Sequence, residues 1–112
     1  MENTEFIKGS KFSFTTQVEY ATGGIVSKNV IKKSTGNVSL FAFDKGESLS
    51  EHTAPFDALA QVIEGNATIT IGGQENQLSA GESIIMPANI THAVLATSRL
   101  KMLLTMIREP KQ

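Results

Sequence analysis

The chain contains no cysteine among its 112 residues. This absence excludes a disulfide framework, a thiolate metal site and a cysteine nucleophile. The sequence also lacks any stretch approaching the roughly 20 apolar residues that a membrane-spanning helix needs, and its first ten residues have no apolar run typical of a signal peptide. We therefore expect a cytoplasmic protein without membrane contact.

Neither sign of charge is in excess. Lys and Arg total 10 and Asp and Glu total 11, which gives a formal net charge of −1. A nearly neutral chain has no general attraction for phosphate backbones, so we expect no nucleic-acid partner. The length suits one domain of ordinary size, and no linker or repeat divides residues 1–112.

Frequent glycines and an alternating pattern of side chains indicate short β-strands. In residues 66–71, Ala67, Ile69 and Ile71 share one face, while two threonines occupy the other. A period of two is the pattern of a strand that is buried on one face. The pair Gly72-Gly73 that follows predicts a tight hairpin, because glycine adopts positive φ without steric cost.

The same reasoning predicts an all-β, antiparallel domain. The expected barrel core covers about residues 36–107, and we expect further N-terminal strands within residues 10–33. The strands expected in the barrel are residues 38–43, 59–63, 66–71, 74–78, 84–86, 93–95 and 100–107. The residues expected in its core are Val38, Phe41 or Phe43, Ile69, Ile71, Ile84, Ile85, Val94 and Leu104.

The segment from residue 46 to residue 65 has the spacing of a known family motif. That motif runs Gly, five residues, His, one residue, His, three or four residues, Glu, six residues, Gly. Here Gly46 and His52 occupy the first two positions and Gly65 the last. Ala54 replaces the second His and Ala58 replaces the Glu.

A second segment has the spacing of the partner motif, which runs Gly, five residues, Pro, one residue, Gly, two residues, His, three residues, Asn. Gly81, Pro87 and His92 stand at their expected places. Asn89 replaces the internal glycine; asparagine is among the residues that best tolerate positive φ. Ala96 replaces the final Asn.

On these two segments the chain resembles the cupin family, and the resemblance implies a jelly-roll β-barrel. It also implies that the metal ligands of the family would fall at positions 52, 54, 58 and 92. Only His52 and His92 keep a donor atom there. They are the two histidines of the chain.

Two functions remain open. The first is a binding domain that holds a small organic molecule in the barrel without catalysis. The expected pocket consists of His52, Phe56, Ala58, Ala60, Val62, Met86 and His92. The alternative is a metal-dependent enzyme of the dioxygenase or isomerase type. It would hold Zn, Ni or Fe on His52 and His92, with Gln61 as a third ligand if a bulge turned it inward. A third interpretation makes both histidines purely structural.

We also expect a homodimer. If alternate residues of 100–107 face the core, Leu103 and Ile107 point outward, as do Leu59 and Ile63 on another strand. Apolar residues grouped in this way usually mark an interface. The alternative is that these residues pack beneath the N-terminal segment of the same chain.

Overall fold

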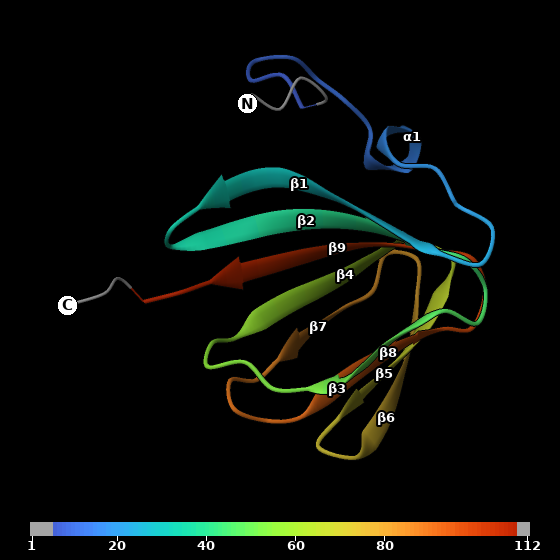
Figure 1. Ribbon diagram of the computed structural model, residues 1–112, viewed down its shortest axis with the longest axis vertical. Helices are drawn as coiled ribbons and strands as arrows, with labels where there is room; N and C mark the ends of the chain where they lie inside the picture. The colour runs from blue at the N-terminus through green and yellow to red at the C-terminus, as the bar shows by residue number, and fades with distance from the viewer. Residues whose placement is uncertain (1–5, 110–112) are drawn as a thin grey trace.

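The structure is a computed structural model that describes residues 6–109. It consists of two β-sheets stacked face to face (Figure 1), and the strand pairings in both sheets are antiparallel. The five-stranded sheet has the order β1 (Ile25–Lys33), β2 (Gly36–Phe43), β9 (Leu100–Ile107), β4 (Ala58–Glu64), β7 (Ser83–Met86). The four-stranded sheet has the order β3 (Ser48–His52), β8 (His92–Ala96), β5 (Asn66–Ile71), β6 (Gln74–Ser79). The expected all-β jelly roll is confirmed.

Alternation along each strand builds the core between the sheets. On β9, Leu100 and Met102 are fully buried in the inner cluster, and Leu104 and Met106 pack against it. The inner cluster, defined by its buried members, contains Phe43, Ala58, Ala60, Val62, Ala67, Ile69, Leu78, Met86, Val94, Ala96, Leu100 and Met102. Ile85 was expected in this core, but it is 61% exposed. It alternates with Ile84 and Met86 on β7, so its side chain points away from the barrel.

Two turns place the strands as the sequence predicted. Gly72 and Gly73 have φ angles of 56° and 83°, and they join β5 to β6 in a tight hairpin. Among the described residues, Asn89 is the one non-glycine residue with positive φ, at 64°. It therefore adopts at the family's glycine position the backbone conformation that a glycine would adopt.

The N-terminal part differs from the expectation. Residues 10–33 contain one strand, β1, and a short helix, α1 (Phe14–Gln17), so the prediction of several strands there is wrong. Phe6, Phe12 and Phe14 stack edge to face, with successive ring centroids 5.1 Å apart. Aromatic packing thus organises this segment in place of a strand ladder. We call residues 6–20 the N-terminal arm.

The arm covers part of the outer face of the five-stranded sheet. Phe6 and Val18 from the arm are buried with Leu40, Ala42 and Leu103 in a second cluster. The Lys101 ammonium donates a hydrogen bond to the Thr15 carbonyl at 2.5 Å, which fastens the arm to β9.

This packing corrects the surface expected for a dimer. Leu103 is only 8% exposed, and Ile63 packs against the same second cluster, so both lie under the chain's own arm. Ile107 is not covered by the arm, and its exposed fraction is 72%. The described part of the chain contains no helix with the length and hydrophobicity of a transmembrane segment.

Candidate functional site

The structure brings His52 and His92 together. They lie opposite each other on the adjacent strands β3 and β8. Their Nε2 atoms are 3.1 Å apart, and the ring planes are inclined by 72°. His52 ends the edge strand β3 and is exposed, whereas His92 is only 5% exposed. One imidazole is thus fixed in the barrel and the other faces solvent.

One hydrogen bond of the pair has a fixed direction, the bond from His52 to the Ser50 backbone. The His52 Nδ1 lies 2.8 Å from the Ser50 carbonyl oxygen. A carbonyl only accepts, so this Nδ1 carries the proton, and in the neutral ring Nε2 is an acceptor. The His92 Nε2 donates to the His52 Nε2 only in the tautomer of His92 that carries its proton on Nε2. The His92 Nδ1 is buried and makes no hydrogen bond of good geometry in the described part of the chain, although the Ile90 carbonyl interacts with the ring.

The surroundings keep His92 neutral. Burial lowers the pKa of His92 below its usual value, and a positive charge on His52 would lower it further. The backbone carbonyl of Ile90 acts in the opposite direction, but it is the smallest of the three influences. Near pH 7 His92 therefore acts as a hydrogen-bonding group without charge.

The other expected pocket residues divide into two groups. Ala58, Ala60, Val62 and Met86 do face the barrel interior, but they are at most 4% exposed and belong to the packed inner cluster. Phe56 does not face the interior. It precedes β4, and the Arg108 guanidinium carbon lies 5.1 Å from its ring centroid. Its assignment to the barrel pocket is wrong, because regular strand alternation does not extend to residue 56.

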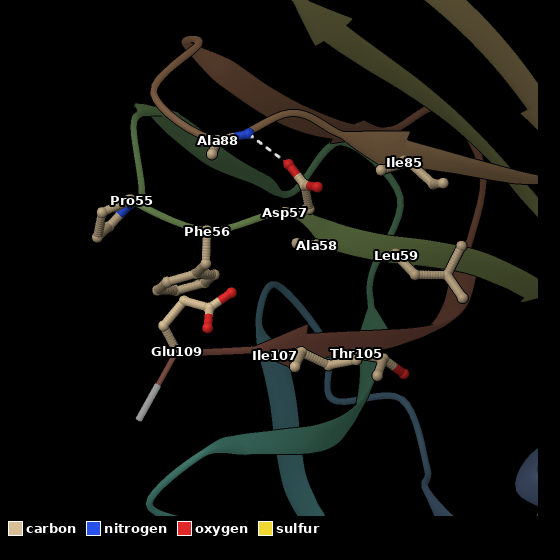
Figure 2. Close-up of a pocket in the computed structure, with 10 residues that line it drawn as sticks. All are labelled: Pro55, Phe56, Asp57, Ala58, Leu59, Ile85, Ala88, Thr105, Ile107 and Glu109. Atoms are coloured by element: carbon tan, nitrogen blue, oxygen red, sulfur yellow. Dashed lines mark hydrogen bonds between the residues drawn. The ribbon is translucent and has the colours of Figure 1, made fainter. Parts of the chain in front are cut away.

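Phe56 instead lines a groove on the outer face of the five-stranded sheet, which Figure 2 shows. The groove measures about 490 Å³. Its lining residues are Pro55, Phe56, Asp57, Ala58, Leu59, Ile85, Ala88, Thr105, Ile107 and Glu109. Sequence reasoning missed this groove, although the outward positions on β4, β7 and β9 could have indicated it. The Asp57 carboxylate accepts a hydrogen bond from the Ala88 N–H at 2.8 Å, which joins the loops before β4 and after β7.

The donor set does not fit a metal ion held by the protein alone. Gln61, the expected third ligand, alternates with Ala60 and Val62 on β4, so it points away from the barrel interior. It also lies in the five-stranded sheet, whereas both histidines lie in the four-stranded sheet. Within residues 6–109, no group of three or more histidine or carboxylate side chains could hold an ion. Catalytic zinc sites normally have three protein ligands. Here the protein offers two.

Comparison with known proteins agrees with the fold and its motifs. The sequence model of the family described as Cupin domain matches residues 39–107. The chain belongs to the cupin family. A cupin superfamily protein from Desulfitobacterium hafniense is 25% identical, with a TM-score of 0.89, and the match covers 97% of this chain and 100% of that one.

Two further relatives match only part of their own length. A Cupin 2 conserved barrel domain protein from Leptotrichia buccalis is 42% identical, with a TM-score of 0.83, over 87% of this chain and 47% of that one. An uncharacterised protein of Streptomyces coelicolor is 29% identical over 62 residues, which are 55% of this chain and 59% of that protein. These matches show the family, and cupins as a fold support many unrelated functions.

Proposed function

We propose that this cupin is a cytoplasmic small-molecule-binding domain whose ligand binds at the His52–His92 pair. The observation that carries the proposal is the buried His92, whose Nε2 lies 3.1 Å from the Nε2 of the exposed His52. Buried polar groups in proteins are almost always hydrogen-bonded, and the partner of the buried imidazole is here itself open to solvent. The pair is also where the two family motifs meet.

The alternative is a metal-dependent cupin enzyme of the dioxygenase or isomerase type. Two nitrogens bound side by side to one ion at about 2.1 Å would lie about 3.0–3.4 Å apart, and the 3.1 Å between the Nε2 atoms falls in that range. His52 and His92 would hold such an ion, which would act as a Lewis acid. Among the described residues, no third histidine or carboxylate side chain joins the pair. We therefore favour the binding domain.

A thermal-shift screen of sugars, organic acids and amino acids tests the proposal. We expect a compound that raises the melting temperature of the parent protein but not that of His52→Ala. Ile85→Ser is the matched control, since it alters the outer groove and leaves the histidine pair intact. A compound whose effect survives in His52→Ala and disappears in Ile85→Ser would move the binding site to the outer groove and overturn the proposal.

A further inference from the structure

We propose that the exposed half of the outer face of the five-stranded sheet binds a second copy of this chain, with the two-fold axis parallel to β9. This surface consists of the groove in Figure 2 and a smaller hollow of about 240 Å³ beside it, and Thr105 and Ile107 line both. The histidine pair belongs to the other sheet, so the proposal does not depend on the proposed function.

The strand register places one side chain from each of the five strands in a single row across this surface. The paired positions, in order from β1 to β7, are Ile31, Val38, Thr105, Leu59 and Ile85. Four of the five are apolar, and the residues at the two ends, Ile31 and Ile85, are exposed. Ile107, two residues further along β9, is also exposed. A contiguous apolar surface of this kind usually marks an interface.

The arm defines where this surface ends. Leu40 and Leu103 are paired positions on the same outer face, two residues before Thr105 along β9, and the arm buries both. The rows at Thr105 and Ile107 lie beyond the arm. A second five-stranded sheet can therefore pack on these two rows without displacing the arm.

Lys33 gives one side of the surface a positive charge. It is paired with Gly36 on β2, and Gly36 is paired with Ile107 on β9. Lys33 therefore lies level with Ile107, on the β1 side of β9, and it lines the smaller hollow. Its side chain is exposed.

The β4 side of Ile107 is acidic. Asp57 immediately precedes β4 and lines the groove together with Glu109. Arg108 lies near these two carboxylates, and its guanidinium donates a hydrogen bond to the Asn37 side chain at 3.0 Å. The three side chains leave this side with a net charge of −1, opposite in sign to Lys33 on the other side.

A two-fold axis parallel to β9 satisfies both the apolar row and the charges. It places β1 of one copy over β7 of the other, so Ile31 faces Ile85 and Lys33 faces the acidic side of the second copy. The same surface is used twice, as a two-fold interface requires, and the two sheets would pack about 10 Å apart. An axis across the strands would instead place each strand over its own copy. Lys33 would then approach Lys33, and such like-charge contacts are unfavourable.

Single-cysteine variants test this arrangement cleanly, because the chain has no cysteine of its own. The parent protein should be a dimer in sedimentation equilibrium at micromolar concentration. A short bismaleimide, which spans facing sheets better than a disulfide does, should join Ile107→Cys to itself, since this residue lies on the axis. Ile31→Cys and Ile85→Cys should each give no covalent dimer alone, whereas a mixture of the two should give one.

A charge reversal gives a second, independent measurement. Lys33→Glu would place a carboxylate against the acidic side at two symmetric positions, so the dissociation constant should rise about 10-fold or more at low salt. Lys32→Glu is the matched control, because this neighbour has the same charge and its side chain points to the opposite face of β1. It should leave the dissociation constant unchanged.

Three results would overturn the inference. Self-cross-linking of both Ile31→Cys and Ile85→Cys would show that the axis runs across the strands. A monomeric parent with no cross-link in Ile107→Cys would show that a second copy is not what binds this surface. Equal effects of Lys33→Glu and Lys32→Glu would remove the proposed charge pairing. Each result leaves ligand binding at the histidine pair untouched, so the proposed function is judged separately.

Discussion

Replacing each histidine in turn should have unequal effects on stability. His92 is 5% exposed, so His92→Ala leaves a cavity and removes a hydrogen bond. By analogy with other buried large-to-alanine changes, it should lower the free energy of unfolding by about 2–5 kcal/mol. His52 is exposed at a strand end, so His52→Ala loses little more than one neutral hydrogen bond, worth about 0.5–1.5 kcal/mol.

The double variant measures the bond itself. If the Nε2–Nε2 contact is a direct hydrogen bond, the two substitutions should be non-additive by about 1 kcal/mol. Urea unfolding near neutral pH supplies the four free energies, with Glu51→Ala on the same strand as a control that should stay within about 0.5 kcal/mol of the parent. Equal losses for the two single variants, or strictly additive effects, would refute the reasoning.

Three further predictions follow from other parts of the structure. Burial lowers the pKa of His92, so below about pH 6.5 the unfolded chain binds more protons than the folded one. As the pH decreases below that value, the free energy of unfolding should therefore fall by up to about 1.4 kcal/mol per pH unit, and above it this group should cause no change. Urea titrations on both sides of that pH test this, and an equal slope in His92→Gln would contradict it. Gly65 and Gly73 have nearly equal φ angles, 85° and 83°. Of these two glycines, Gly65 is the one at which an added Cβ would collide with backbone, at the Arg99 carbonyl. Gly73→Ala should therefore cost about 1–2 kcal/mol and Gly65→Ala clearly more, and equal thermal midpoints would contradict this. The homodimer stays a prediction, on the bare part of the outer face: in sedimentation equilibrium Ile107→Glu should give a folded monomer, whereas Leu103→Glu, which buries a charge under the arm, should unfold the protein. A parent protein that sediments as a monomer would rule out the dimer.

The sequence predicted the barrel well because period-two alternation and glycine turns act locally. The strand expected at residues 100–107 is β9 with the same bounds, and Gly72-Gly73 forms the expected hairpin. The motif spacing also placed His52 and His92 at positions that turn out to be opposite each other. In each case the decisive information lies in neighbouring residues or in a fixed spacing.

The wrong sequence-based predictions concern residues whose position is set by tertiary contacts. Phe56 lies before the start of β4, so alternation carried backward from the strand assigned it to the wrong face. Ile85 lies in a short apolar run whose inward and outward residues are equally hydrophobic, and hydrophobicity alone cannot orient such a strand. The arm packs on the sheet through Phe6 and Val18, and its sequence gives no strand or helix period that would predict this packing.

Metal content tests most directly whether this cupin is a binding domain rather than a metal-dependent enzyme. Inductively coupled plasma mass spectrometry would be applied to protein purified without an affinity tag. The matched variant carries Ala54→His and Ala58→Glu, which restore the two donors that the family motif has and this chain lacks. We predict that the parent holds no stoichiometric transition metal and that the double variant does. About one Zn, Ni or Fe per parent chain, lost in His92→Ala, would contradict the account.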